Sequence, residues 1–431
     1  MITTQWRDLL NVVRPALAAT ALAGPVLAST ALASTALPPV AHAHAQAPPS
    51  SYSSTSSDPH GQYSSIGSSA HDASSAAAAA SSLSSTVPLS AAPAITLAEL
   101  AEGPLGSAMF EGMAGVTGSS LSSGSSNAAA TFPDPDAPPA EFRHIRHLEG
   151  NVYEFTVYSP SMDRLVKNDI LLPGGPDNTA ARPTFYLMMG ADGAAGGYSW
   201  YNSSNYQEFF ADKHVNVVTP KGSVSSMQAD WYEEDVATGT NKWSTYLTRE
   251  LPPLVDELFH GTGRDAIAGI SMSGGPALAI ASLDSQRFKA AGSYSGCPST
   301  TGVLGLSYAW SGVTMNGADP TKMWGLPGDE AWAAHSPVLH IEALRDTAVF
   351  VGSAQGVPGE IDAAPLSSRI NAQMGIEMAS YACSAHFVDQ ARKQGLEVTW
   401  YPLVEGTHTW GVFEKLMRKS WPTIGPAIGV E

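Results

Sequence analysis

The sequence predicts an α/β domain on a mostly parallel sheet with helices on both faces. After residue 140, short apolar segments alternate with helical ones, which is typical of such a sheet. The apolar segments are continuous, as expected for strands covered on both faces. The expected strands are 152–158, 184–189, 215–219, 265–269, 290–295, 348–352 and 398–403, and the expected helices include 243–259, 274–283 and 375–393.

The N-terminal residues predict export rather than a place in the fold. Residues 1–47 carry Arg7 and Arg14 before an Ala/Leu-rich stretch and end in overlapping Ala-x-Ala sites, which indicates a signal peptide. The alternative is an N-terminal membrane anchor, but Pro25 and Pro38 interrupt the apolar run. No later segment is long and apolar enough to span a bilayer. We therefore expect a secreted or cell-envelope protein.

The amino-acid composition divides the rest of the chain into a tether and a folded domain. Residues 48–140 are rich in Ser, Ala, Gly and Pro, a composition that predicts a disordered tether. Residues 141–431 are expected to form one domain. The chain has 22 Lys and Arg against 39 Asp and Glu, a net charge of −17, and no basic cluster. This argues against nucleic acid as a partner and against binding to membranes through a polybasic patch.

The sharpest motif is Gly269-Ile270-Ser271-Met272-Ser273-Gly274, between an apolar strand and a small-residue helix. A serine on such a strand-to-helix turn is the nucleophile elbow of the α/β-hydrolase fold. Ser273 replaces the usual last glycine of the motif. The alternative is a serine at an ordinary helix N-terminus. We predict Ser271 as the nucleophile.

The base and the acid should follow the nucleophile in the order Ser, acid, His. His408 lies just after the last predicted strand, in a glycine-containing loop, and is the predicted base. Three carboxylates follow the strand that ends near residue 352: Glu360, Asp362 and Glu377. Glu377 is favoured because it opens a helix and is held rigidly, whereas the other two lie in a Gly/Pro-rich loop. A solvated helix-face carboxylate remains the alternative for Glu377.

An oxyanion hole needs two backbone N–H groups. One is expected from Met272, and the other from the glycine-rich loop 189–197. That loop lacks a phosphate-binding lysine motif, and no metal-ligand spacing occurs, so neither cofactor nor metal is expected. Cys297 and Cys383 are the only cysteines and form a candidate disulfide, with two buried free thiols as the alternative.

Seven short motifs in residues 150–425 resemble the mycolyltransferases, exported acyltransferases of mycolic-acid bacteria. They are Tyr158–Met162, Gly190–Gly193 with Trp200, Asp230–Tyr232, Lys242–Pro252, Gly269–Gly274, Lys322–Gly325 and Gly406–Trp410. The Ser295–Pro298 segment is more similar to the corynebacterial branch of the family than to the mycobacterial one.

The resemblance implies an α/β-hydrolase fold with Ser271, Glu377 and His408 as the triad and the backbone of Ala191 and Met272 as the oxyanion hole. It also implies substrate contacts at Asp192, Trp200 and Trp410. Asp192 stands where mycobacterial relatives have an arginine, so the sugar contacts, though not the acyl chemistry, are expected to differ. Ser336 replaces an aspartate before Pro337.

The implied reaction is transfer of a mycolyl group from trehalose monomycolate, through an acyl-enzyme, to a second trehalose mycolate or to a cell-wall sugar such as arabinogalactan. Residues 303–324 are apolar enough to line a lipid tunnel, with ordinary core packing as the equal alternative. The competing functions are a carboxylesterase that uses water, a non-enzymatic envelope-binding protein, and an enzyme that acylates proteins or wall polysaccharide instead of trehalose.

Overall fold

The computed structural model describes residues 128–362 and 370–431. The predicted signal peptide and the predicted tether up to residue 127 lie outside this part of the chain. None of the helices within it is both long and apolar enough to cross a membrane.

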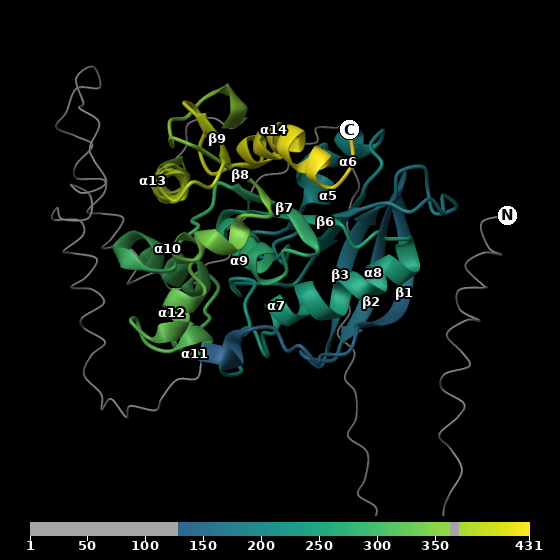
Figure 1. The fold of residues 1–431 in the computed structure, drawn as a ribbon, viewed down its shortest axis with the longest axis horizontal. Coiled ribbons are helices and arrows are strands. Elements are labelled where there is room, and N and C mark those ends of the chain that lie inside the picture. Colours follow the sequence, from purple (N-terminus) through teal and green to yellow (C-terminus); the bar gives the residue numbers. More distant parts are fainter. Residues whose placement is uncertain (1–127, 363–369) are drawn as a thin grey trace, which may run out of the picture. The chain divides into compact units, whose positions relative to one another are not determined.

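A nine-stranded sheet forms the centre of the domain, in the order β1-β2-β3-β5-β4-β6-β7-β8-β9 (Figure 1). Strands β1 to β3 pair antiparallel, and β3 pairs antiparallel with β5. From β5 to β9 every neighbouring pair is parallel. The strands are β1 (Glu141–Glu149), β2 (Val152–Ser159), β3 (Arg164–Leu171), β4 (Thr184–Met188), β5 (Asn216–Pro220), β6 (Asp265–Ile270), β7 (Phe288–Tyr294), β8 (Ala348–Ala354) and β9 (Val398–Leu403).

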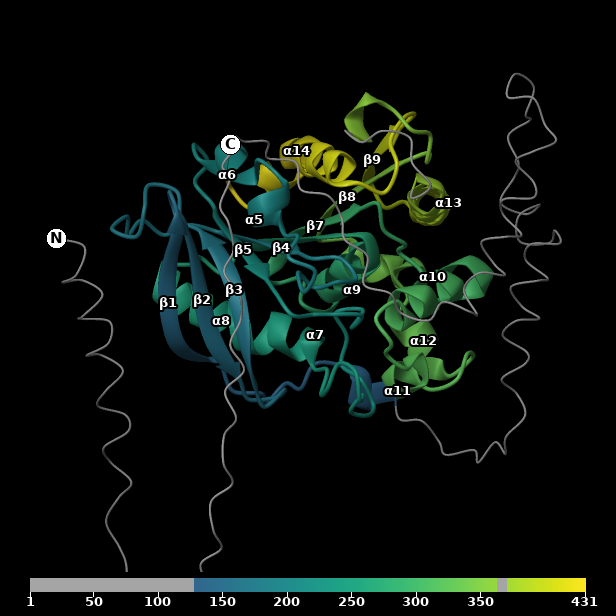
Figure 2. The ribbon, with the colours of Figure 1, turned by 180° about the vertical axis from the view of Figure 1, so that it is seen from behind.

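Helices cover both faces of the sheet, as Figures 1 and 2 show from opposite sides. The α-helices are α5 (Trp200–Ser203), α6 (Tyr206–Phe210), α7 (Trp243–Thr245), α8 (Leu251–Phe259), α9 (Gly274–Leu283), α10 (Gly302–Thr314), α11 (Pro320–Trp324), α12 (Glu330–Ala334), α13 (Ile370–Lys393) and α14 (Trp410–Ala427). A π-helical turn, η3 (Tyr246–Glu250), joins α7 to α8. The 3₁₀ turns are η2 (Ala128–Thr131), η4 (Ser271–Ser273), η5 (Pro337–Leu339), η6 (Ile341–Leu344) and η7 (Glu360–Asp362).

The core consists of two apolar layers, because alternate residues of a strand point to opposite faces. On β4, Tyr186 and Met188 pack in the layer that also contains side chains of α8, α9 and α13. Phe185 and Leu187 pack in the other layer, with α5, α6 and α14. A third, smaller cluster joins α10, α11 and α12 to Ala191 and Met272, close to the predicted nucleophile.

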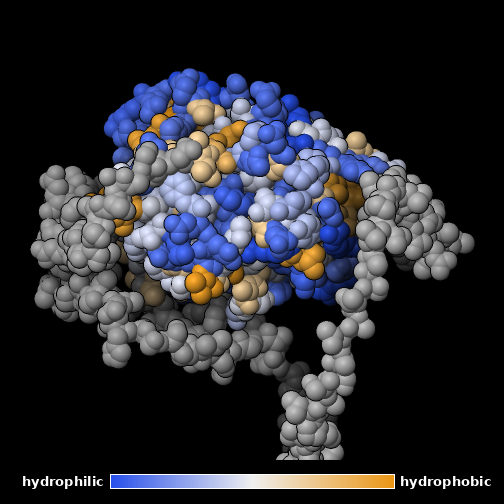
Figure 3. Space-filling model, turned by 90° about the horizontal axis from the view of Figure 1, so that it is seen from below, coloured by the Kyte–Doolittle hydropathy of each residue, from blue (hydrophilic) through white to orange (hydrophobic). Residues whose placement is uncertain are grey.

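The face of the domain seen from below carries apolar side chains in small groups (Figure 3). Seen from below, the described part of the molecule is mostly hydrophilic, with apolar residues in small scattered groups (Figure 3).

The predicted α/β fold with a mostly parallel sheet is confirmed, and the differences lie at its periphery. All seven predicted strands form, within one or two residues at most ends. The strands β1 and β3 were not expected, because charged or polar residues occupy most positions of β1 and half of those of β3. The predicted helix 243–259 is divided by η3, and the helix expected from residue 375 begins at residue 370.

The packed domain also begins earlier than residue 141. Thr131 is fully buried, and its Oγ1 lies 2.7 Å from Nε2 of His335. The ring of Phe132 stacks on the same histidine, with ring centroids 4.7 Å apart. Residues 128–140, which composition assigned to the tether, therefore belong to the folded part.

Candidate active site

Ser271 lies on a strained turn between β6 and α9. Its φ angle is +55°, in the left-handed region that side chains other than glycine rarely adopt. The strand and the helix can meet this closely because glycines flank the turn. A Cβ added at Gly269 would lie 2.2 Å from the carbonyl oxygen of Ser273, and one at Gly275 would lie 2.2 Å from that of Cys297. This is the geometry of a nucleophile elbow.

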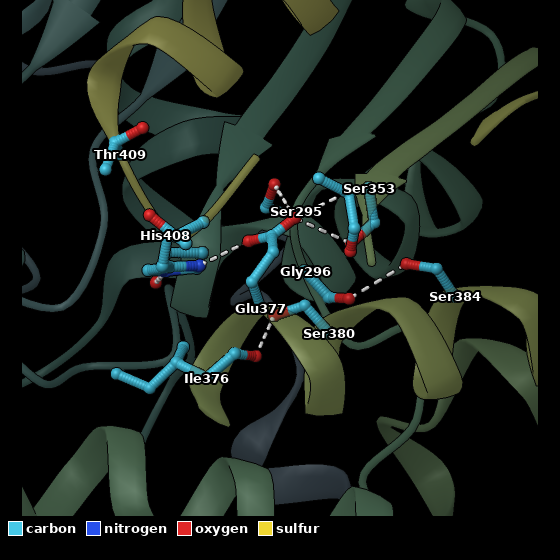
Figure 4. Close-up of polar contacts among 12 residues, drawn as sticks. Ser295, Gly296, Ser353, Ile376, Glu377, Ser380, Ser384, His408 and Thr409 are labelled. Carbon is cyan, nitrogen blue, oxygen red and sulfur yellow. Dashed lines mark hydrogen bonds and ion pairs between the residues drawn. The ribbon is translucent and has the colours of Figure 1, made fainter. Parts of the chain in front are cut away.

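His408 joins the serine to a carboxylate. Its Nε2 lies 2.7 Å from Oγ of Ser271, and its Nδ1 lies 2.7 Å from Oε2 of Glu377. The imidazole side chain is 10 % exposed, and the carboxylate is fully buried. Figure 4 shows Glu377 reaching from α13 toward the histidine. The three predicted triad residues, 137 and 31 positions apart along the chain, therefore meet at the carboxyl edge of the sheet.

The second oxygen of Glu377 is held by three donors. Oε1 accepts hydrogen bonds from Oγ of Ser295 at 2.7 Å, Oγ of Ser353 at 2.9 Å and the backbone N–H of Ala354 at 2.7 Å. These three hydrogen bonds replace the hydrogen bonds to water that the carboxylate loses when it is buried. The two serines come from the ends of β7 and β8, so the sheet fixes the orientation of Glu377 (Figure 4).

The three carboxylates that the sequence left open occupy different positions. Glu377 contacts His408; because α13 begins at residue 370, it lies inside that helix rather than at its opening. Asp362 accepts hydrogen bonds from Thr407 and Thr409, on either side of His408. Glu360 is exposed.

The predicted oxyanion loop lies directly against the nucleophile. A Cβ added at Gly190 would be 3.3 Å from Cβ of Ser271. The carbonyl oxygen of Ala191 accepts hydrogen bonds from the N–H of Ser225 at 2.8 Å and from Nδ2 of Asn316 at 3.0 Å, which fixes the peptide. Gly193 (φ +55°) has no room for a side chain, since a Cβ there would lie 2.7 Å from the backbone nitrogen of Val224.

The three predicted substrate contacts differ in how far they are buried and in what they contact. Trp410 is half-buried and stands edge-on to Trp200, with ring centroids 5.4 Å apart. Trp200 itself is fully buried, so in this structure it supports Trp410 from behind and presents no surface to a substrate. Asp192 is half-buried, and its Oδ1 accepts a hydrogen bond from the N–H of Ala194 at 3.2 Å. Burial raises the pKa of Asp192.

Tyr308, on α10, is a polar group of the site that the sequence reasoning did not identify. Its hydroxyl lies 3.1 Å from Oγ of Ser380 and 3.3 Å from the carbonyl oxygen of Ser295. Burial raises its pKa to about 12, and hydrogen bonding to Ser380 and Ser271 opposes that rise. Ser295 and Ser353 were also missed. The carboxyl ends of parallel strands gather at one edge, and this would have been the signal for both.

Cys297 and Cys383 form a disulfide, with their Cα atoms 5.0 Å apart. It links the segment after β7 to α13, the helix that carries Glu377. Within residues 128–362 and 370–431, no group of three or more His, Cys, Asp or Glu side chains is arranged to hold a metal ion.

Comparisons with known proteins show the family of the chain. The model of the putative esterase family matches residues 159–424. Ag85A of Mycobacterium tuberculosis, a diacylglycerol acyltransferase/mycolyltransferase, is 27 % identical over 77 % of this chain and 91 % of its own length. Ag85C of Mycobacterium leprae, which carries the same description, is 30 % identical over 60 % of this chain and 72 % of its own length.

Solved structures extend the likeness to the fold. MPT51 of Mycobacterium tuberculosis is 26 % identical, with a TM-score of 0.54 over 66 % of this chain and 99 % of its own. An S-formylglutathione hydrolase of Agrobacterium tumefaciens, 14 % identical with a TM-score of 0.51, covers 67 % of this chain and shares the fold alone. The chain therefore belongs to the esterase family and, within it, to the diacylglycerol acyltransferase/mycolyltransferases, and it is an acyl-transferring enzyme of the serine-hydrolase type.

Proposed function

We propose that this chain is an exported mycolyltransferase that moves a mycolyl group from trehalose monomycolate to a second trehalose mycolate or a cell-wall sugar hydroxyl such as that of arabinogalactan. The observation that carries the proposal is the position of His408, within 2.7 Å of both Ser271 and Glu377, in a chain of this family. Export rests on residues 1–47, whose sequence has the pattern of a signal peptide.

The proposed reaction has two steps. His408 takes the proton of Ser271 as Oγ attacks the ester carbonyl, while Glu377 stabilises the imidazolium that forms. The N–H groups of Ala191 and Met272 bind the developing oxyanion. The imidazolium then protonates the leaving trehalose oxygen, which leaves Ser271 acylated. In the second step His408 removes the proton from the acceptor hydroxyl, whose oxygen attacks the acyl carbon. The bond from that carbon to Oγ of Ser271 then breaks, and the imidazolium returns the proton to Oγ.

The acyl chain would lie along α10 and α11. Leu304, Leu306 and Trp310 on α10 are half-buried, and Met315 just after it is 58 % exposed. Met323 on α11, by contrast, is fully buried and belongs to the core. The stretch 303–324 thus offers a partly open apolar wall beside Met272, the residue after the nucleophile. Transfer outcompetes hydrolysis when such a wall and a bound sugar keep water from the acyl-enzyme.

The test is to incubate the purified full chain with trehalose monomycolate and to analyse the lipid products, with and without excess trehalose. Ser271→Ala, Glu377→Gln and His408→Ala are measured in parallel, with Glu360→Gln as the matched carboxylate control. We expect trehalose dimycolate from the wild type and from Glu360→Gln. We expect a loss of at least about 1,000-fold in Ser271→Ala and His408→Ala, because triad members act as a unit.

Each outcome discriminates between functions. Free mycolic acid without dimycolate, at every trehalose concentration, would identify a secreted carboxylesterase, a function that the esterase-family match also fits. Turnover that survives in Ser271→Ala would exclude the acyl-enzyme.

A further inference from the structure

The loop that carries His408 is attached to a carboxylate other than Glu377. Oδ1 of Asp362 accepts hydrogen bonds from the backbone N–H of Thr407 at 2.8 Å and from its Oγ1 at 2.9 Å. The same oxygen accepts one from Oγ1 of Thr409 at 3.0 Å. Oδ2 accepts one from the N–H of Gly359 at 2.8 Å. Asp362 thus binds the residues on both sides of His408.

Backbone hydrogen bonds hold the loop at single points. The N–H of Thr409 donates to the carbonyl of Thr407 at 2.8 Å, a three-residue turn with His408 at its tip. The N–H of His408 makes a longer bond, 3.3 Å, to the carbonyl of Gln373. Gly406, with a φ of +133°, precedes the turn, and its N–H donates to the carbonyl of Val357 at 2.6 Å. Catalysis requires the imidazole to stay within a few tenths of an ångström of its position against Ser271.

We propose that Asp362 is a positioning residue of the acyl transfer, a carboxylate that clasps the His408 turn from both sides and so keeps Nε2 within reach of Ser271. The inference rests on the proposed function, because it concerns the same site. The role is distinct from that of Glu377, which contacts the imidazole directly.

Both carboxylate oxygens of Asp362 accept hydrogen bonds, Oδ1 from the His408 turn and Oδ2 from Gly359. All four groups that face them are donors, namely the N–H groups of Thr407 and Gly359 and the two threonine hydroxyls. An asparagine has the same shape but one acceptor oxygen, so its NH₂ group would face a donor on one side. Burial opposes ionisation of Asp362, but these donors outweigh it and lower its pKa. The group is therefore a carboxylate at neutral pH.

The chain supplies a matched control two residues away. Glu360 lies in the same turn, is exposed, and takes part in no hydrogen bond or ion pair reported within the described residues. Glu360→Gln removes the same charge from the same segment without touching the His408 turn. Thr409→Val removes one donor of the clasp and keeps the shape of the side chain.

The experiment uses the full chain and a probe that needs Ser271 and His408 but no sugar. Hydrolysis of p-nitrophenyl butyrate and the rate of inactivation by an alkyl fluorophosphonate are measured for the wild type, Asp362→Asn, Thr409→Val, their double variant and Glu360→Gln. Thermal unfolding of each variant is followed in parallel. We expect kcat to fall 10- to 100-fold in Asp362→Asn and three- to tenfold in Thr409→Val, with KM within twofold of the wild type. The double variant should match Asp362→Asn rather than the product of the two losses, because both changes open one clasp.

The outcomes separate this inference from the proposed function. A reactive wild type whose kcat is unchanged in both Asp362→Asn and Thr409→Val would overturn the positioning role alone. Multiplicative losses in the double variant, or an equal loss in Glu360→Gln, would also overturn it. A wild type inert to both probes would overturn the proposed nucleophile, and with it any role for Asp362. If Asp362→Asn fails to fold, the kcat and KM of Thr409→Val still decide.

Discussion

At the scale of single residues, the site depends on hydroxyl groups that hold the catalytic side chains rather than react. Ser295 donates to Oε1 of Glu377 at 2.7 Å from a backbone conformation with a φ of +48°, which is strained for a residue other than glycine. That strain aims the hydroxyl at a fully buried carboxylate. A hydrogen bond to a charged, buried acceptor is stronger than one between neutral groups.

Ser295→Ala should therefore weaken both stability and turnover. It removes one of three donors to Oε1, and a lost hydrogen bond to a charged group costs about 1.5–3 kcal/mol. We expect that loss in the free energy of unfolding in urea, and a fall in kcat on p-nitrophenyl butyrate of about tenfold. Ser353→Ala, which removes the neighbouring donor at 2.9 Å, should behave alike. A stable Ser295→Ala with unchanged kcat would show that two donors suffice.

Tyr308→Phe tests a hydroxyl that stands beside the nucleophile. The hydroxyl of Tyr308 donates to the carbonyl of Ser295 at 3.3 Å and also lies 3.1 Å from Oγ of Ser380. Because the pKa of Tyr308 is about 12, the phenol stays neutral below pH 10 and cannot serve as a base there. We expect kcat to fall three- to tenfold and the pH–rate profile between pH 5 and 9 to keep its shape. A changed profile would instead indicate proton transfer by Tyr308.

At the scale of elements, the buried parallel strands and the turns between them could be predicted from the sequence. The strand 265–270 and the helix 274–283 could be predicted because glycines bound their apolar runs. The close packing of the strand against the helix requires these glycines. The strand β3 was missed because Asn168 and Asp169 are buried in it. Only the fold supplies their partners, Tyr246 and Lys221.

Some residues of the candidate site could likewise be predicted from the sequence, and others could not. Local sequence motifs identify Ser271 and His408. Glu377 could be chosen among the three carboxylates only because a predicted helix fixes its position and because the family resemblance implies it. The clasp role of Asp362 could not be predicted, because it depends on contacts with residues more than forty positions away.

Alanine substitutions at two helix glycines test how closely the helices pack against their neighbours. Gly275 in α9 faces the carbonyl of Cys297, and a Cβ there would come within 2.2 Å of it. Gly275→Ala should therefore destabilise the domain by about 1–3 kcal/mol, the usual cost of overpacking. A Cβ at Gly375, in α13, would meet nothing within 4 Å, so Gly375→Ala should stabilise by up to about 1 kcal/mol. Unfolding of both variants in urea measures whether each change raises or lowers the free energy of unfolding. A Gly275→Ala variant as stable as the wild type would contradict the close contact.

At the scale of the whole molecule, the segment before β1 closes the domain over a buried histidine. His335 stacks on Trp324 with ring planes 2° apart and centroids separated by 4.6 Å, while Phe132 stacks with it at 4.7 Å. Thr131 donates its hydroxyl proton to the carbonyl of Ala128, so its Oγ1 accepts from Nε2–H of His335. Nε2 of His335 thus carries a proton, and Thr131 and Phe132 pack against the ring.

This arrangement predicts a specific loss of stability in acid. Burial, and to a smaller degree the charge of His340, lower the pKa of His335 from 6.5 to about 4. Between these values the unfolded chain binds a proton that the folded domain does not, so stability falls as the pH decreases from 6.5 to 4. The loss is at most about 3 kcal/mol. Asp265, whose pKa burial raises to about 6, acts in the opposite direction, so the effect must be measured as a difference between variants.

The measurement compares the free energy of unfolding at pH 7.5 and pH 4.5 for chains that begin at residue 128 and at residue 141, each with and without His335→Gln. The longer chain should lose more stability in acid than its His335→Gln variant, because only the former carries the buried imidazole. In the shorter chain Thr131 and Phe132 are absent, so water reaches His335 and its pKa returns toward 6.5. The acid-dependent difference between histidine and glutamine should then disappear, and the shorter chain should be less stable at pH 7.5. Equal pH dependence in all four chains would mean that residues 128–140 do not seal the histidine, and that the domain begins at residue 141 after all.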